Sequence, residues 1–268
     1  MYSKFNLKVN SEFEEELTEY LEAGKALYNR FEPNARKSLE KFIYTNGHIN
    51  GTAMKENWFQ MEDVDVFISH AHQDTDNVKA FAGWLHEEFG LTSFIDSCVW
   101  GYCNDLLKEM DNEYCKNEDT PTYDYNKRNY TTSHVHTMLS CALTEMIDRT
   151  ECIMFYNSPE SIILKEELKN TVESKTGSPW IYYELAMTSL VKYTEPDRFK
   201  MKERHFAHKE LLAESIEVEY DVEKYLKDMS LISSKDLAEW HNQKQRFQGA
   251  HSLDILYDYI IKRDQDKI

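Results

Sequence analysis

The chain is poor in the residues that mark several common enzyme classes. It holds eight glycines among 268 residues, with neither a Gly-x-Gly-x-x-Gly fingerprint nor a glycine-rich phosphate-binding loop. The absence of both motifs argues against a dehydrogenase and against a nucleoside triphosphatase. The five cysteines are odd in number and form no Cys-x-x-Cys pair, so we expect reduced thiols and no structural zinc site.

Long apolar runs and positive charge are also missing. No stretch approaches the ~18–20 apolar residues that span a bilayer, and the polar start, Met1-Tyr-Ser-Lys-Phe-Asn, is unlike a signal peptide. We therefore expect a cytoplasmic protein without a membrane partner. The net charge of −17 argues against unaided binding to nucleic acid, and an anionic ligand would need local donors such as helix N-termini.

The first part of the chain has a helical pattern. A capping-box sequence, Ser11-x-x-Glu14, precedes apolar residues at roughly helical spacing, and Pro33 separates them from a second helical stretch. We predict a helical N-terminal extension over residues 1–62, followed by the main domain over residues 63–268.

A strand, a helix and a second strand open the main domain. Residues 64–69 are a short apolar run rich in β-formers, as in a strand buried on both faces. Apolar residues recur at helical spacing over 78–89, Gly90 is well placed to end that helix, and 91–96 form the next strand. This βαβ unit predicts a parallel sheet.

The rest of the chain continues the alternation, with polar insertions expected near residues 111–132 and 158–177. We predict, in order, a helix with Ser133 as its N-cap, a strand over 151–157, a helix over 180–191, a modest strand over 216–222 and a closing helix over 253–260. The fold class is therefore a doubly wound α/β sheet, in which ligands bind beyond the carboxyl ends of the strands.

Those carboxyl ends are expected at Ser69-His70, at Asp96-Ser97 and at Tyr156-Asn157. A site there would also draw on the helix that carries Trp180 and Glu184. These two residues are four apart and project from one helix face. An indole beside a carboxylate suits a pocket for a flat, electron-poor ring near a developing positive charge. The alternative is a core tryptophan beside a solvated glutamate.

Three segments carry a family resemblance. Val66-Phe-Ile-Ser-His70, then Ser93-Phe-Ile-Asp96 with its loop toward Gly101, then Trp180-x-x-x-Glu184-Leu185 resemble the TIR domain in this order. The match is closer to bacterial TIR proteins that cleave NAD+. It covers residues 63 to about 191, and it extends toward residue 268 because Tyr220-Asp-Val222 is similar to that family's last strand.

The resemblance implies a flavodoxin-like parallel sheet, with NAD+ as substrate and neither cofactor nor metal. It makes Glu184 the catalytic residue and places Ser69 and His70 in the nucleotide site. Asp96 would bind ribose or cap the loop, and Trp180 would stack on a substrate ring or shape the wall. The loop over residues 97–102 would gate the pocket and mediate assembly. It is shorter than usual and offers Cys98, Val99 and Trp100 where the family has charged residues, and we take Trp100 as a substrate contact.

The resemblance also implies a role in antiphage immune signalling. The products would be nicotinamide and either ADP-ribose or a cyclic isomer of it, sensed by a downstream effector. Self-association through TIR surfaces is expected to complete the site.

Two other functions remain open from the sequence. In a TIR module that only binds other TIR domains, Glu184 would lie on the surface and residues 97–102 would form the functional binding loop. A metallo-β-lactamase-like hydrolase is suggested by Ser69-His-Ala-His-Gln-Asp74, although Thr75 replaces the last histidine of that signature. The pair His134-x-His136 is expected to make ordinary polar contacts, because alternate residues on a helix face apart.

Overall fold

The computed structural model describes residues 1–30, 39–59, 63–117, 120–166, 172–199, 220–243 and 248–265. Its strands form one five-stranded sheet and one three-stranded sheet. The strands of the larger sheet are β1 (Ser3–Lys8), β2 (Val66–Ser69), β3 (Ser93–Ile95), β4 (Cys152–Tyr156) and β8 (Ser230–Ser233). Those of the smaller sheet are β5 (Ile163–Glu166), β6 (Val172–Thr176) and β7 (Tyr220–Asp221).

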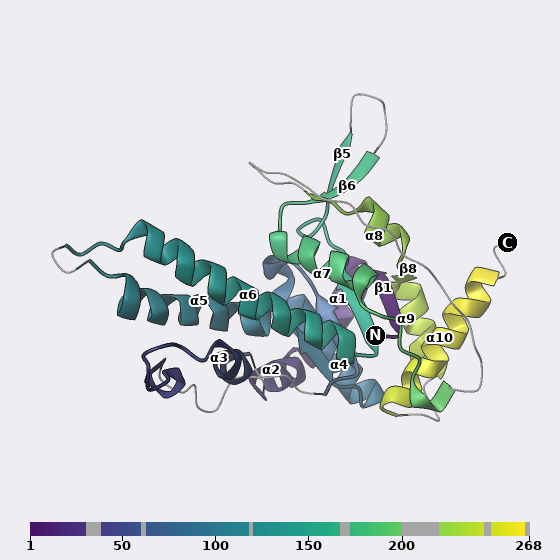
Figure 1. Cartoon of the computed structure of the whole chain (residues 1–268). Helices are drawn as coiled ribbons and strands as arrows, with labels where there is room; N and C mark the ends of the chain where they lie inside the picture. The colour runs from purple at the N-terminus through teal and green to yellow at the C-terminus, as the bar shows by residue number, and fades with distance from the viewer. Residues whose placement is uncertain are drawn as a thin grey trace.

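The helices surround the larger sheet (Figure 1). In chain order they are α1 (Ser11–Leu17), α2 (Leu21–Arg30), α3 (Gly51–Trp58), α4 (Thr75–Phe89), α5 (Ser97–Met110), α6 (Tyr125–Arg149), α7 (Pro179–Leu190), α8 (Glu223–Lys227), α9 (Ser234–Gln243) and α10 (Ala250–Gln265). Short 3-10 helices occur at Thr18–Tyr20, Leu39–Phe42, His72–Asp74 and Asp197–Phe199.

The central sheet is parallel throughout, with strand order β3-β2-β4-β1-β8. Phe67 of β2 is in register with Phe94 of β3 and with Ile153 of β4. Strands β3, β2 and β4 stand in the 2-1-3 order that opens a flavodoxin-like sheet. The next place is taken by β1, which comes from the start of the chain.

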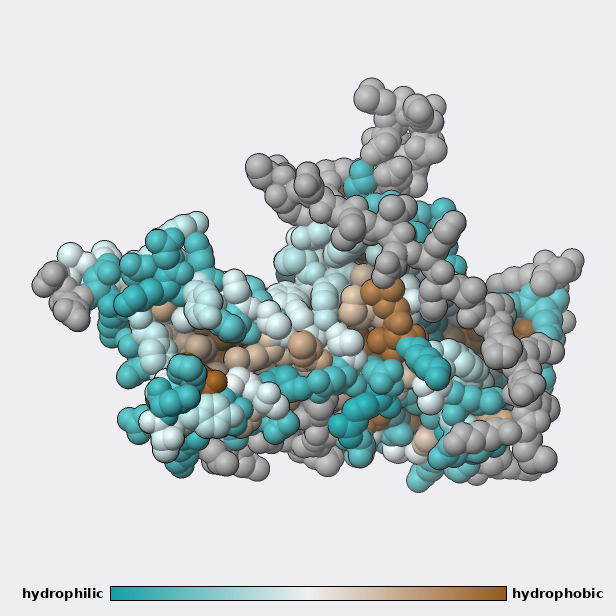
Figure 2. Space-filling view, in the orientation of Figure 1, coloured by the Kyte–Doolittle hydropathy of each residue, from teal (hydrophilic) through white to brown (hydrophobic). Residues whose placement is uncertain are grey.

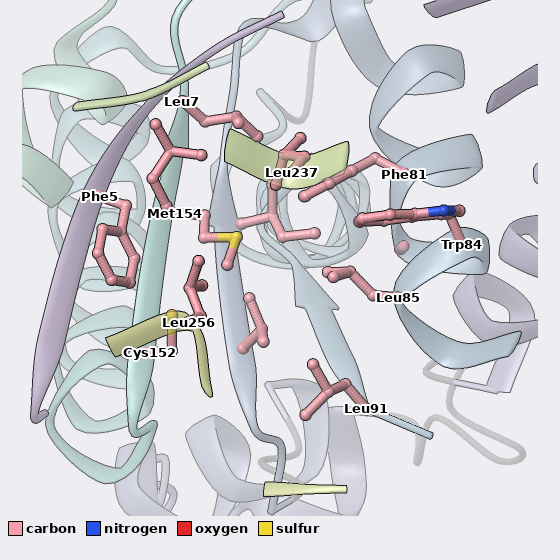
Figure 3. Packing of buried hydrophobic residues seen from close by; sticks show 14 of the residues in the cluster. Phe5, Leu7, Phe81, Trp84, Leu85, Leu91, Cys152, Met154, Leu237 and Leu256 are labelled. Atoms are coloured by element: carbon pink, nitrogen blue, oxygen red, sulfur yellow. The ribbon is translucent and has the colours of Figure 1, made fainter. Parts of the chain in front are cut away.

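Alternate strand residues supply two apolar layers. Val66 and Ile68 pack with α4, α9 and α10 on one face of the sheet, whose core Figure 3 shows. Phe67 packs with α3, α5 and α6 on the other face. Helices therefore cover both faces, and the prediction of a doubly wound α/β sheet is confirmed. Gly90 ends α4 in the left-handed conformation at φ 66°, as the sequence predicted.

The helical extension predicted for residues 1–62 is wrong in one important respect. The helices are present, but residues 3–8 form β1, which pairs with β4 and β8 inside the central sheet. Phe5 and Leu7 are buried in the same apolar cluster as α4. The first residues of the chain are therefore part of the core.

The same segment contacts α4 through two glycines. A Cβ built on Gly24 of α2 would lie 1.7 Å from the carbonyl oxygen of Lys79, and one built on Gly83 would lie 2.2 Å from that of Tyr20. Only residues without a side chain allow the helix backbones to approach this closely.

The region after β3 also differs from the prediction. Residues 97–102 form the first turns of α5 and not a loop. The expected insertion over 111–132 contains one π-helical turn and the start of α6, whose N-cap is Asp124 and not Ser133. Asp111, which follows α5, connects that helix to α6. Its carboxylate accepts hydrogen bonds from Arg128 Nε and Thr131 Oγ1 of α6 at 2.8 Å each.

The segment over residues 158–177 contains the β5–β6 hairpin. Of the strand predicted over 216–222, residues 216–219 lie outside the described residues. Tyr220 and Asp221 form β7, which pairs antiparallel with β6 and so does not join the central sheet. The last strand of that sheet is β8, which the sequence did not predict.

Most of the face seen in Figure 2 is hydrophilic, with hydrophobic atoms in the hollow between α6 and α3. A cavity of about 830 Å³ lies there, and its lining includes Ile49, Met110 and Met138.

Among the residues that the structure describes, no helix has the length and apolar character needed to cross a bilayer.

Candidate functional site

Four of the predicted site residues meet at the carboxyl ends of β2 and β3. Ser69 ends β2 and His70 follows it, Asp96 follows β3, and Glu184 lies in α7. None of them is more than 2% exposed. We call these four side chains the Ser69–Glu184 cluster.

Local sequence determines where α7 begins. The Ser178 side chain caps the helix by accepting a hydrogen bond from the Ile181 amide at 3.3 Å, and Pro179 occupies the first turn. Trp180 packs with the α5–α6 layer, whereas Ile181 and Leu185 pack with α8. Glu184 is also buried on this helix, with its carboxyl group at the sheet edge.

Hydrogen bonds join the cluster. Ser69 Oγ donates to Glu184 Oε2 at 2.6 Å, and the His70 backbone amide donates to Asp96 Oδ2 at 3.2 Å. The His70 ring lies between two groups, with Nδ1 2.5 Å from Asp96 Oδ1 and Nε2 3.4 Å from the Thr75 hydroxyl at the start of α4. Side chains from β2, β3, α4 and α7 thus hold one another in place.

The two carboxyl groups share a low-dielectric site. Burial raises the pKa of Glu184 well above its usual value, and the neighbouring Asp96 charge raises that pKa further. Burial also raises the pKa of Asp96. Asp96 Oδ1 and Glu184 Oε1 are both buried without a hydrogen-bond partner among the described residues, and two neighbouring carboxyl groups in such a site disfavour double ionisation. The raised pKa values of both groups therefore favour a proton shared by the pair.

His70 is neutral under the same conditions. Burial lowers the pKa of His70 to about 4, against the charges of Glu184 and Asp74, which raise it. A neutral imidazole has one N–H to donate, and the short Nδ1 to Asp96 distance favours that proton on Nδ1. His70 therefore orients Asp96 without adding charge to the site.

The two predicted tryptophans are not in this cluster. The Trp180 ring lies edge-on to His136 at 5.5 Å and to Tyr183 at 6.4 Å between centroids, so it packs toward α6. Trp100 lies in α5, and its side chain is outside the described residues. The role of either residue at the substrate stays a prediction.

One hydrogen bond between two loops at this edge of the sheet was not predicted from the sequence. Asp74, which precedes α4 and is 7% exposed, accepts a hydrogen bond from the Ser158 hydroxyl at 2.5 Å. This bond ties the loop after β2 to the loop after β4. An aspartate just before a helix was the available signal, but its partner lies 84 positions away in the chain.

The residues of the suggested metallo-hydrolase signature point to different partners. His70 lies against Asp96, His72 is exposed, and Asp74 binds Ser158. Within the described ranges, no group of three or more His, Cys, Asp and Glu side chains is placed to hold a metal ion. The parallel sheet and these diverging side chains disfavour that hydrolase.

The other candidate metal pair diverges as well. The His134 ring contacts Tyr130 edge-on at 4.5 Å between centroids, and His136 contacts Trp180. The two histidines face apart, as predicted, but the contacts found are with aromatic rings and not the ordinary polar contacts that were expected.

Comparison of the chain with protein-family models, with curated proteins and with solved structures finds no match. The chemistry of the Ser69–Glu184 cluster is therefore argued from its residues and geometry.

Proposed function

We propose that this protein is a TIR-type enzyme that cleaves the bond between nicotinamide and ribose in NAD+, with Glu184 as the catalytic residue. The observation that carries the proposal is the buried Glu184 carboxyl group, hydrogen-bonded to Ser69 at the carboxyl end of a parallel strand. Ligands of such sheets bind at this edge. The motif resemblance, in which Trp180-x-x-x-Glu184 supplies the catalytic residue, supports the same assignment.

The chemistry needs a negative charge beside the sugar. When the C1′–N bond breaks, nicotinamide leaves with the bonding electron pair and the ribosyl group becomes oxocarbenium-like. The Glu184 carboxylate stabilises that charge in a site that excludes water, where electrostatic interactions are strong. Water then attacks C1′ and gives its proton to a carboxylate of the pair, yielding ADP-ribose.

Asp96 supports Glu184 by holding the shared proton. With that proton on Asp96, Glu184 is ionised and faces the pyridinium and the developing sugar cation. The positive charge of NAD+ favours this distribution, because an opposite charge stabilises the ionised form of a carboxyl group. Exclusion of water would also allow another nucleophile of the same nucleotide to attack C1′, which gives a cyclic isomer.

Substrate entry requires a rearrangement, because Glu184 is 1% exposed. We propose that self-association opens and completes the site. A cytoplasmic role in antiphage signalling, with a downstream effector that senses the product, belongs to the same proposal and rests on the family resemblance.

A TIR module that only binds other TIR domains is the competing function. It led us to expect Glu184 on the surface, and the burial of this carboxyl group favours the enzyme. Burying two neighbouring carboxyl groups is costly, and groups with strongly shifted pKa values cluster at functional sites.

Incubation of the purified protein with NAD+, followed by chromatographic quantification of nicotinamide and ADP-ribose species, separates the two functions. The enzyme releases nicotinamide in proportion to time and protein concentration. A binding module leaves NAD+ intact over the whole concentration range.

A further inference from the structure

A second hollow lies at the same edge of the central sheet, beside β1 and β4. Its volume is about 670 Å³. The lining includes Asn6 and Lys8 of β1, and Asn157 and Ser158, which follow β4. Small-ligand sites commonly measure ~300–1,000 Å³. The chain leaves β4 toward α7 and leaves β1 toward α1, on opposite faces of the sheet. Such divergence opens a crevice between neighbouring parallel strands.

Two asparagines present a hydrogen-bonding edge to this cavity. Asn157 Nδ2 donates to Asn6 Oδ1 at 2.8 Å, and Asn6 is only 8% exposed. This bond leaves the Asn157 oxygen as an acceptor and the Asn6 amide nitrogen as a donor. Within the described residues, neither of these two atoms makes another hydrogen bond to a side chain. An adjacent donor and acceptor match the edge of a purine base, which side-chain amides read in the same way.

The charge of the lining is positive although the chain as a whole is strongly negative. Among the described residues, the charged members of the lining are Lys8, Lys227 and Glu223, a net charge of +1 in a protein of net charge −17. Lys227 Nζ lies 3.2 Å from Glu223 Oε1, whereas Lys8 has no acidic partner among the described residues. A lysine in this setting is a ready contact for a phosphate group.

Apolar side chains complete the walls. Ile162 and Leu226 are 7% and 8% exposed, and Ile163 is 43% exposed. A flat ring can lie against these aliphatic groups while its polar edge meets the asparagines.

We propose that this cavity binds a purine nucleoside monophosphate, with Lys8 at the phosphate and the Asn6–Asn157 pair at the base. The site is distinct from the Ser69–Glu184 cluster, and its occupation does not depend on NAD+ cleavage. The Asp74–Ser158 hydrogen bond connects the two, because Ser158 lines the cavity and Asp74 lies in the loop after β2.

Isothermal titration calorimetry with AMP, adenosine and ribose 5-phosphate tests the assignment. Lys8→Ala removes the phosphate contact, so AMP and ribose 5-phosphate should each bind at least about tenfold more weakly. Asn157→Ala should weaken the binding of AMP to a similar extent and leave the binding of ribose 5-phosphate unchanged. Lys235→Ala, at an exposed lysine of α9, is the charge-matched control and should bind AMP as the wild type does.

Glu184→Gln separates this site from the proposed active site. If the cavity is the nucleotide site, this variant binds AMP with the wild-type Kd, whether or not the protein cleaves NAD+. Absence of AMP binding by the wild type overturns the proposal. So does unchanged binding by Lys8→Ala, or a loss of binding caused by Glu184→Gln while Lys8→Ala still binds. Thermal unfolding verifies that each variant is folded. Lys8→Ala should unfold at the midpoint temperature of the wild type.

Discussion

Ser69 Oγ donates a hydrogen bond of 2.6 Å to Glu184 Oε2, and the two residues are 115 positions apart in the chain. The bond joins the end of β2 to α7 inside the protein, since Ser69 is 2% and Glu184 1% exposed. The position of the proposed catalytic carboxylate is therefore determined by the edge of the central sheet as well as by its own helix.

Removal of the Ser69 hydroxyl should destabilise the fold. Ser69→Ala leaves Glu184 Oε2 without its donor in a buried site, which costs about 1–3 kcal/mol of the free energy of unfolding. Urea unfolding followed by tryptophan fluorescence measures the loss. Ser133→Ala is the matched control, because that exposed hydroxyl bonds only to a carbonyl of its own helix, and its effect should stay within about 0.5 kcal/mol. Equal effects of the two substitutions would contradict the account.

The shared proton gives the protein a specific pH dependence. Burial raises the pKa of Glu184 well above 4.5, so the folded state keeps a proton that the unfolded chain has released. This contribution to stability is complete below about pH 4.5 and is lost as the pH rises through the folded-state pKa. Glu184→Gln has no such proton, so its stability relative to the wild type should improve as the pH is raised from about 5 to about 8.

The stability of the variant must be compared with that of the wild type at each pH, because the contribution of His70 to stability changes with pH in the opposite direction. Burial lowers the pKa of His70 to about 4, so its contribution is complete above about pH 6.5 and is lost as the pH falls through 4. Above about pH 5 the buried His70 is neutral in the folded state of both proteins, so the difference between their urea-unfolding free energies reports mainly the Glu184 proton. Glu239→Gln, at an exposed site on α9, controls for the change in net charge. A difference between Glu184→Gln and the wild type that does not vary with pH would refute the shared proton.

Local pattern was enough to predict the elements that build the cluster. The apolar runs that became β2, β3 and β4 contain residues buried on both sides, and α4 and α7 have clear start or stop signals. Because parallel strands bring their carboxyl ends to one edge, four of the six candidate residues could be placed together from the sequence. Which atoms would bond was beyond prediction, since Ser69 and Glu184 meet only through the tertiary fold.

The elements that escaped prediction depend on distant partners. In β1, Lys4, Asn6 and Lys8 alternate with Phe5 and Leu7, and its place in the sheet depends on β4, more than a hundred residues later. The start of α6 carries the exposed Tyr125 and Tyr130, so it has no apolar stripe toward its own core. Capping by Asp124 and the contacts of Asp111 hold that end of the helix.

The close contact between α2 and α4 makes a sharp test of the N-terminal segment. Gly24→Ala places a methyl group 1.7 Å from the Lys79 carbonyl oxygen, so the helices must separate at a cost of about 1–3 kcal/mol or more. Gly177→Ala is the control, because a Cβ there meets nothing within 4 Å. Thermal unfolding compares the two. If residues 1–62 were a detachable appendage, Gly24→Ala would leave the main unfolding transition unchanged.

Nicotinamide release from NAD+ by the wild type and by Glu184→Gln, at equal concentrations of folded protein, tests the central claim most directly. The variant keeps the size and the Ser69 hydrogen bond of the side chain and loses its negative charge. We predict that nicotinamide release falls at least about a hundredfold, because one group that stabilises the transition-state charge contributes roughly that factor or more. Turnover by Glu184→Gln at the wild-type rate would contradict the assignment of Glu184.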